Sequence, residues 1–163
     1  MTMGQKGFSL VELLTVVATM IILLSVATLQ FSSMMRKRDM EKEIRMIYTD
    51  LSEVRQKALY EKTPRAVKFT ANEFTVYPGA STTASPVLRR TLNHPVGWST
   101  ADSVLVVTFD TFGISDNDGT LCICIDPSSS NSAQVDSLKI TPTRVDLGKR
   151  TEGTCVDENI NLK

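Results

Sequence analysis

The chain opens with a polar segment, residues 1–7, which leads into an apolar stretch from Phe8 to Phe31. This stretch contains no Lys, Arg, Asp, Asn, Gly or Pro, and Glu12 is its single charged residue. As a helix it would be about 36 Å long, enough for a bilayer core of about 30 Å. A cleaved secretory signal would carry its small-residue site after the apolar run, whereas Gly7 precedes it. The pattern therefore predicts a membrane-spanning helix that stays with the protein.

The helical pattern continues beyond the apolar stretch, because residues 32–62 contain neither Gly nor Pro. Apolar residues recur at steps of three and four between Met40 and Leu59, and charged residues occupy the other face. Pro64 marks the end of the pattern. We predict one helix over about 8–62, whose second half is amphipathic and packs on a globular head.

After the helix the periodicity changes to alternation of apolar and polar residues, which predicts a β-rich head over residues 63–163. The final segment, 148–163, is predicted to be a polar tail with one fixed point, Cys155. The predicted fold class is α+β, with a long amino-terminal helix followed by a β-rich head. Strands are predicted at 66–70, 73–77, 87–92, 103–109, 120–125, 137–141 and 144–147.

Composition adds few chemical constraints. Lys plus Arg and Asp plus Glu each number 18, so net charge does not indicate a nucleic-acid or acidic partner. Three Cys and one distant His do not form a structural zinc pattern, and the turn 116–119 lacks the Glu of an EF-hand because position 125 is Ile. His94 and Trp98 lie among turn residues without a nucleophile or paired carboxylates nearby in sequence. We predict no metal, no cofactor and no enzyme activity.

The cysteines predict one disulfide. Cys122 and Cys124 are two residues apart on a predicted strand and share one of its faces, an unsuitable spacing for a mutual disulfide. We expect Cys155 to pair with one of these two residues and to fix the tail to the sheet. Closing this loop would contribute about 3–4 kcal/mol to stability.

Glu12 is costly in a membrane helix, by about 2.5–3.5 kcal/mol near the helix centre. It is either incidental to an ordinary anchor or it has a partner. The run Gly7-Phe8-Ser9-Leu10-Val11-Glu12-Leu13 ahead of an apolar helix resembles the class III signal of type IV pilins and pseudopilins. The resemblance implies cleavage after Gly7 by a membrane prepilin peptidase and N-methylation of Phe8. It also implies that Glu12 pairs with the amino terminus of Phe8 in a neighbouring subunit.

Three further segments stand out in the sequence: Leu51-x-x-Val54-Arg55-x-x-Ala58, Thr108-Phe109-Asp110-x-x-Gly113 and Ile140-x-x-x-Arg144-Val145-x-Leu147-Gly148-Lys149. They resemble segments of the GspH/FimT type of minor pilin and pseudopilin. The resemblance implies a type IV pilin-like fold, with a long amino-terminal helix packed on an antiparallel β-sheet head. The chain would then have four parts: a leader (1–7), a transmembrane and assembly helix (8–31), an amphipathic half of the helix (32–62) and the head (63–163).

The implied function is a structural subunit, at or near the tip, of a type IV pilus or a type II secretion pseudopilus. Its partners would be other pilins or pseudopilins, the prepilin peptidase and the inner-membrane assembly platform. The chain would cross the bacterial inner membrane once, with its head in the periplasm, before it enters the filament. Charge alone favours the opposite orientation, because Lys6 precedes the apolar stretch and Arg36, Lys37 and Arg38 follow it.

DNA binding is the alternative function. FimT-type subunits of competence pili bind DNA through a basic segment with a Gly-Arg-x-Arg pattern near the carboxyl end. The corresponding stretch here is Gly148-Lys149-Arg150-Thr151, and Arg144 could add a third phosphate contact. Because few phosphates would be neutralised, the affinity would be weak and sensitive to salt. The nearby acidic residues Glu152, Asp157 and Glu158 oppose it.

Overall fold

The computed structural model describes residues 9–117, 119–127, 131–151 and 153–163, with all of their side chains except those of 26–30. Gly7 and Phe8, the predicted cleavage and methylation sites, lie outside the described residues. The chain divides into two compact units, Met1–Arg36 and Lys37–Lys163.

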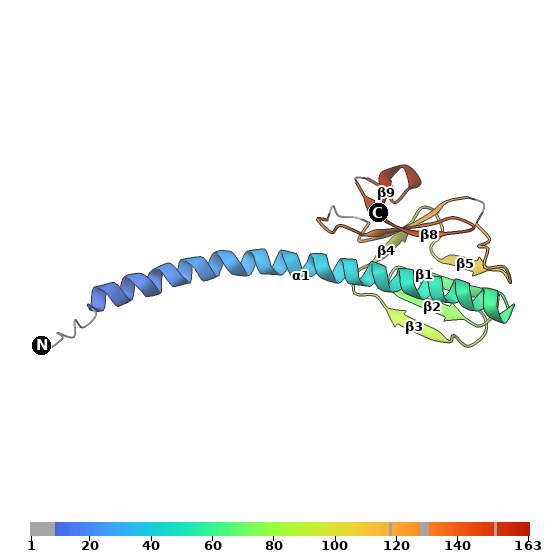
Figure 1. Cartoon of the computed structure of the whole chain (residues 1–163), viewed down its shortest axis with the longest axis horizontal. Helices are drawn as coiled ribbons and strands as arrows, with labels where there is room; N and C mark the ends of the chain where they lie inside the picture. The colour runs from blue at the N-terminus through green and yellow to red at the C-terminus, as the bar shows by residue number, and fades with distance from the viewer. Residues whose placement is uncertain (1–8, 118, 128–130, 152) are drawn as a thin grey trace, which may run out of the picture. The chain divides into compact units, whose positions relative to one another are not determined.

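Helix α1, Leu10–Glu61, is continuous over 52 residues (Figure 1). Its continuity follows from the absence of Gly and Pro within these bounds, since either residue weakens a helix interior. The helix ends just before Lys62, which has a left-handed φ of 54° at the exit towards Pro64. The single helix predicted from the sequence is therefore confirmed over its described residues.

In the second unit, α1 buries a stripe of apolar side chains against the head. The stripe follows the predicted steps of three and four, although Leu59 remains 39% exposed and Tyr48 is only half-buried. Glu43 and Asp50 are buried on the same side, which the pattern did not predict. The buried apolar residues are Met40, Ile44, Ile47, Leu51, Val54 and Ala58.

The head contains two antiparallel sheets, which confirms the predicted α+β class. The strand order is β3-β2-β1-β5 in the first sheet and β4-β6-β7-β8-β9 in the second. The strands are β1 (Arg65–Thr70), β2 (Glu73–Tyr77), β3 (Leu88–Thr91), β4 (Val96–Trp98), β5 (Leu105–Phe109), β6 (Leu121–Ile125), β7 (Ser137–Ile140), β8 (Val145–Arg150) and β9 (Ile160–Leu162).

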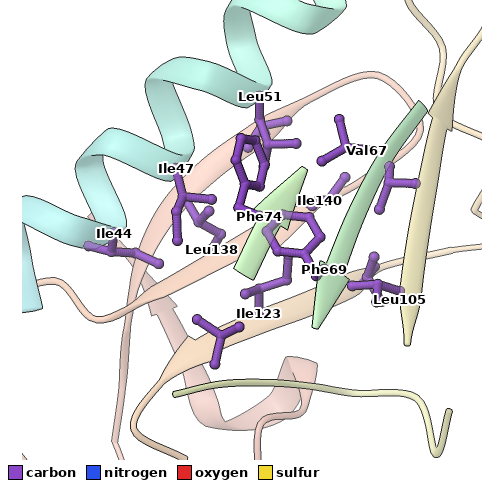
Figure 2. Packing of buried hydrophobic residues seen from close by; sticks show 14 of the residues in the cluster. Ile44, Ile47, Leu51, Val67, Phe69, Phe74, Leu105, Ile123, Leu138 and Ile140 are labelled. Carbon is purple, nitrogen blue, oxygen red and sulfur yellow. The ribbon is translucent and has the colours of Figure 1, made fainter. Parts of the chain in front are cut away.

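The core lies between α1 and these sheets. Figure 2 shows Ile47 and Leu51 of α1 near Phe74 of the first sheet and Leu138 of the second. The rings of Phe69 and Phe74 stack at a tilt, with centroids 5.0 Å apart. One cluster of buried apolar residues thus joins the helix to both sheets.

The carboxyl-terminal segment differs from the prediction. Strand β8 continues to Arg150, and a 3-10 turn, Asp157–Asn159, precedes β9. Strand β9 adds a fifth strand to the second sheet by pairing Gly148 with Leu162 and Arg150 with Ile160. The prediction of a polar tail with one fixed point was wrong, because backbone pairing holds this segment despite its polar composition.

Candidate assembly site

The amino-terminal part of α1 presents apolar side chains to solvent on every face. All described side chains over 9–25 are exposed, and the large apolar ones range from 46% exposed at Val17 to 79% at Leu10. An exposed apolar surface of this extent marks an interaction site. Among the residues with described side chains, no helix has both the length and the apolar character needed to cross a membrane.

Three of the four hydroxyl groups in this segment, those of Thr15, Thr19 and Ser25, bond to the helix itself. Thr15 Oγ1 donates to the Glu12 carbonyl at 2.9 Å, and Thr19 Oγ1 donates to the Val16 carbonyl at 2.8 Å. Ser25 Oγ donates in the same way to the Ile22 carbonyl at 2.7 Å. Because these three donors are satisfied internally, their hydroxyl groups can enter apolar surroundings without losing a hydrogen bond.

Glu12 lies in the first turn of α1 and is exposed. Its carboxylate makes no ion pair or hydrogen bond to any described residue of this chain. The positive end of the helix dipole favours a carboxylate at this position. The predicted pairing with an amino terminus in another subunit stays a prediction, since Phe8 is not described.

The structure contains a disulfide between Cys124 and Cys155, with 5.9 Å between their Cα atoms. Cys122 remains a buried free thiol in the same cluster as Ile160. Burial raises the pKa of the Cys122 thiol, and the charge of Lys139 partly opposes this. Sequence reasoning left both pairings open because Cys122 and Cys124 face the same side of β6.

Lys149, a predicted DNA contact, is held within the head. Its ammonium group donates to Asp136 Oδ2 at 2.7 Å, to the Asn131 carbonyl at 2.9 Å and to Asn131 Oδ1 at 3.0 Å. The Asp136 side chain is fully buried and also accepts the Arg150 amide and the Ser137 hydroxyl. The buried carboxylate of Asp136 thereby neutralises the lysine charge, which weighs against a phosphate contact.

Arg150 is 5% exposed, and its guanidinium points into the head. It donates to the carbonyls of Pro127 at 2.6 Å, Asp126 at 3.1 Å and Gly153 at 3.3 Å. Of the three predicted basic contacts, Arg144 alone has a largely exposed side chain, at 65%. The run Gly148-Lys149-Arg150 could not reveal that Arg150 is buried, because the sequence of charges does not show which backbone carbonyls surround the side chain in the fold.

Buried carboxylates of α1 hold strand β3 and the loop that follows it. Glu43 accepts the backbone amides of Asn93 at 2.6 Å and His94 at 3.2 Å, and its Oε2 is 2.9 Å from His94 Nδ1. Asp50 binds Arg90 through two hydrogen bonds of 2.5 and 3.2 Å, which raise the pKa of the arginine. These contacts give His94 a structural role. The helical pattern placed Asp50 on the solvent-exposed face, and no local signal in the sequence showed that it would be buried against Arg90.

The three segments of pilin resemblance meet at one end of the head. Arg55 Nε of the first segment donates to the Gly113 carbonyl of the second at 2.8 Å. Asp110 Oδ1 shapes that second segment by accepting the amides of Phe112 and Ile114, both at 2.8 Å. Arg144 of the third segment lines the same groove as Arg55 and Gly113. The sequence identified the segments, but the structure brings them together.

Comparison with solved structures identifies the fold. Two crystal forms of the type IV minor pilin FimU of Pseudomonas aeruginosa superpose on the chain with a TM-score of 0.58 and 12% sequence identity. The matches cover 71% and 74% of this chain and 99% and 98% of the pilin chains. Neither a protein-family model nor a curated protein sequence matches the chain. The chain therefore has the fold of a type IV minor pilin.

Proposed function

We propose that the chain is a minor pilin, a structural subunit built into a type IV pilus at or near its tip. The observation that carries the proposal is the exposed apolar segment 9–25, with Glu12 in its first turn, attached to a chain of pilin fold. Packing of this segment among similar helices would remove its apolar surface from water. Neighbouring pilins are therefore the partners that this surface fits best.

The processing steps belong to the same proposal. The prepilin peptidase cuts after Gly7 and methylates Phe8, while the helix holds the chain in the inner membrane with its head in the periplasm. The assembly platform then moves the subunit from lipid into the filament, where Glu12 meets the amino terminus of a neighbour. The internally bonded hydroxyls of Thr15, Thr19 and Ser25 support transfer between two apolar environments.

Incorporation into filaments tests the proposal directly. Sheared and purified filaments from the source bacterium should contain the chain, and its amino-terminal peptide should begin with methylated Phe8 in mass spectrometry. Loss of the prepilin peptidase should leave the chain in the membrane fraction with residues 1–7 attached. A chain that is absent from filaments, or that keeps its leader in a strain with active peptidase, would contradict the proposal.

A type II secretion pseudopilus is the alternative machine. The same co-purification distinguishes them, because a pilus subunit should accompany surface filaments and a pseudopilin should accompany the secretion apparatus. We do not propose DNA binding as a second function, since Lys149 and Arg150 bond within the head.

A further inference from the structure

A groove of about 630 Å³ lies in the head, beside the part of α1 that the sheets leave uncovered. Helix residues from Tyr48 to Leu59 form one wall, and the turn at Phe112 and the hairpin at Arg144 form the other. Its volume falls within the range of protein binding sites. None of the residues that line the groove belongs to the apolar segment 9–25.

Arg55 places a fixed positive charge in the groove. Its Nε is held by the Gly113 carbonyl at 2.8 Å, and its two terminal nitrogens make no hydrogen bond to the described residues. Gly113 has a φ of 70°, and a Cβ there would lie 3.3 Å from the Arg55 side chain. The guanidinium is thus oriented by the backbone while its forked end remains available for a carboxylate.

Arg144 supplies a second positive charge. Its side chain is 65% exposed, and its guanidinium lies 3.0 Å from Asp146 Oδ2. Asp146 is the one acidic residue among those that line the groove. Two arginines and one carboxylate among the lining residues leave an excess of positive charge in the groove, which favours an acidic occupant.

The rim of the groove identifies the kind of occupant. Phe112 is 68% exposed and Leu59 is 39% exposed, and Lys62 Nζ lies 5.6 Å from the centre of the Phe112 ring. Phe, Tyr and Arg are the residue types enriched at the centres of protein–protein interfaces. A free anion would satisfy the arginines but would leave this apolar rim in water. A protein segment that carries both an acidic and an apolar side chain satisfies both.

We propose that this groove docks an acidic side chain, flanked by apolar residues, on a neighbouring subunit of the same filament. The class of neighbour rests on the proposed function, whereas the acidic and apolar character of the docked segment rests on the groove itself. Arg55 and Arg144 bind the carboxylate, and Phe112 and Leu59 cover the apolar flank.

Photo-crosslinking in cells tests the docking. The full-length chain carries p-benzoylphenylalanine in place of Phe112, and the crosslinked peptide is identified by mass spectrometry. We expect a peptide with an acidic residue beside apolar ones, from another filament subunit or from a second copy of this chain. The matched probe at Val87, which is 62% exposed outside the groove, should not capture that peptide.

Charge reversal tests the chemistry of the capture. R144E should reduce the Phe112 crosslink about tenfold, and R144A should reduce it less. The control variant K42E, at an exposed position of α1 outside the groove, should leave the crosslink unchanged. Replacing the captured acidic residue by Lys should restore crosslinking to R144E but not to the native chain.

Each remaining outcome overturns the docking. A crosslink to lipid or DNA, equal capture from Val87, or indifference to R144E would each show that the groove does not bind an acidic protein segment. The proposed function fails separately. If the chain is absent from filaments yet Phe112 captures an acidic segment in an Arg144-dependent way, the docking stands and only the class of neighbour changes.

Discussion

Single side chains in the head hold loops through backbone carbonyls. Arg150 is the strongest case, because one guanidinium spans carbonyls from two separate segments, 126–127 and 153. Its charge is buried and its donors are matched by acceptors, so removing the fork leaves buried carbonyls unpaired. This role is structural, in contrast to the DNA contact that its position in a basic run suggested.

Replacement R150K should therefore destabilise the head. The compact ammonium group cannot reach all three carbonyls, and we expect a loss of about 3 kcal/mol in the free energy of unfolding. Urea denaturation of the detergent-solubilised chain, followed by the fluorescence of Trp98, measures it. The control R89K changes an arginine whose side chain is 63% exposed, so its effect should stay within about 0.5 kcal/mol. Equal effects of the two variants would contradict the assigned role.

We expect the buried thiol of Cys122 to make the head less stable at alkaline pH. Burial raises the pKa of its thiol in the folded state above the ordinary 9.0. The unfolded state therefore ionises first, and the free energy of unfolding should fall as pH rises above about 9, by at most about 1.4 kcal/mol per pH unit. Below that pH the thiol is protonated in both states, so it should not contribute to the pH dependence of the free energy of unfolding. Urea titrations at several pH values should show that C122A removes this part of the decline; an unchanged decline would exclude Cys122 as its source.

At the scale of elements, the repeating pattern of apolar residues predicted the long segments but not the shortest strands. The apolar steps from Met40 to Ala58 and the alternation in β1 and β2 gave the helix and the first hairpin. Strands β4 and β9 are three residues long, too short for a repeating pattern. Their pairing depends on partners that are distant in sequence, such as Val96 with Ile125.

The same distinction applies to the candidate sites. A motif at fixed spacing marked Gly7, Phe8 and Glu12, because that signal is local in sequence. The carbonyl cage of Arg150 and the alignment of Arg55 with Gly113 depend on tertiary contacts between residues far apart in the chain. No local pattern carries that information.

Gly148 offers a test of how the carboxyl-terminal strand is held. An added Cβ would lie 2.4 Å from Ile160 Cγ2, so G148A should force β9 away from β8 and cost about 1–3 kcal/mol. Hydrogen exchange should show faster exchange of the amides that pair these two strands. The control G79A adds a Cβ that meets nothing within 4 Å. Unchanged protection in G148A would show that the strands have room to adjust.

At the scale of the whole molecule, the two units present different chemistry. The first unit exposes apolar side chains on all faces with one carboxylate near its start, whereas the second has a closed core and a groove with excess positive charge. Under the proposed function, the two surfaces would have different roles. The apolar helix would pack in a filament core that tolerates different neighbours, and the head would supply the selectivity that apolar packing lacks.

The proposed role of Glu12 in assembly can be tested separately from processing. In an apolar filament core an unpaired carboxylate is costly. Pairing of Glu12 with a neighbour's amino terminus would therefore stabilise the one helix register in which the two groups meet. E12A and E12Q should both be cleaved after Gly7 and methylated, because the scissile bond is unchanged, yet should enter filaments about tenfold less than the native chain. Quantitative immunoblots of sheared filaments, with mass spectrometry of the amino-terminal peptide, separate the two steps. T15A, which removes a hydroxyl bonded within the helix, serves as the matched control and should assemble normally. Native-like incorporation of both Glu12 variants would mean that apolar packing alone sets the register.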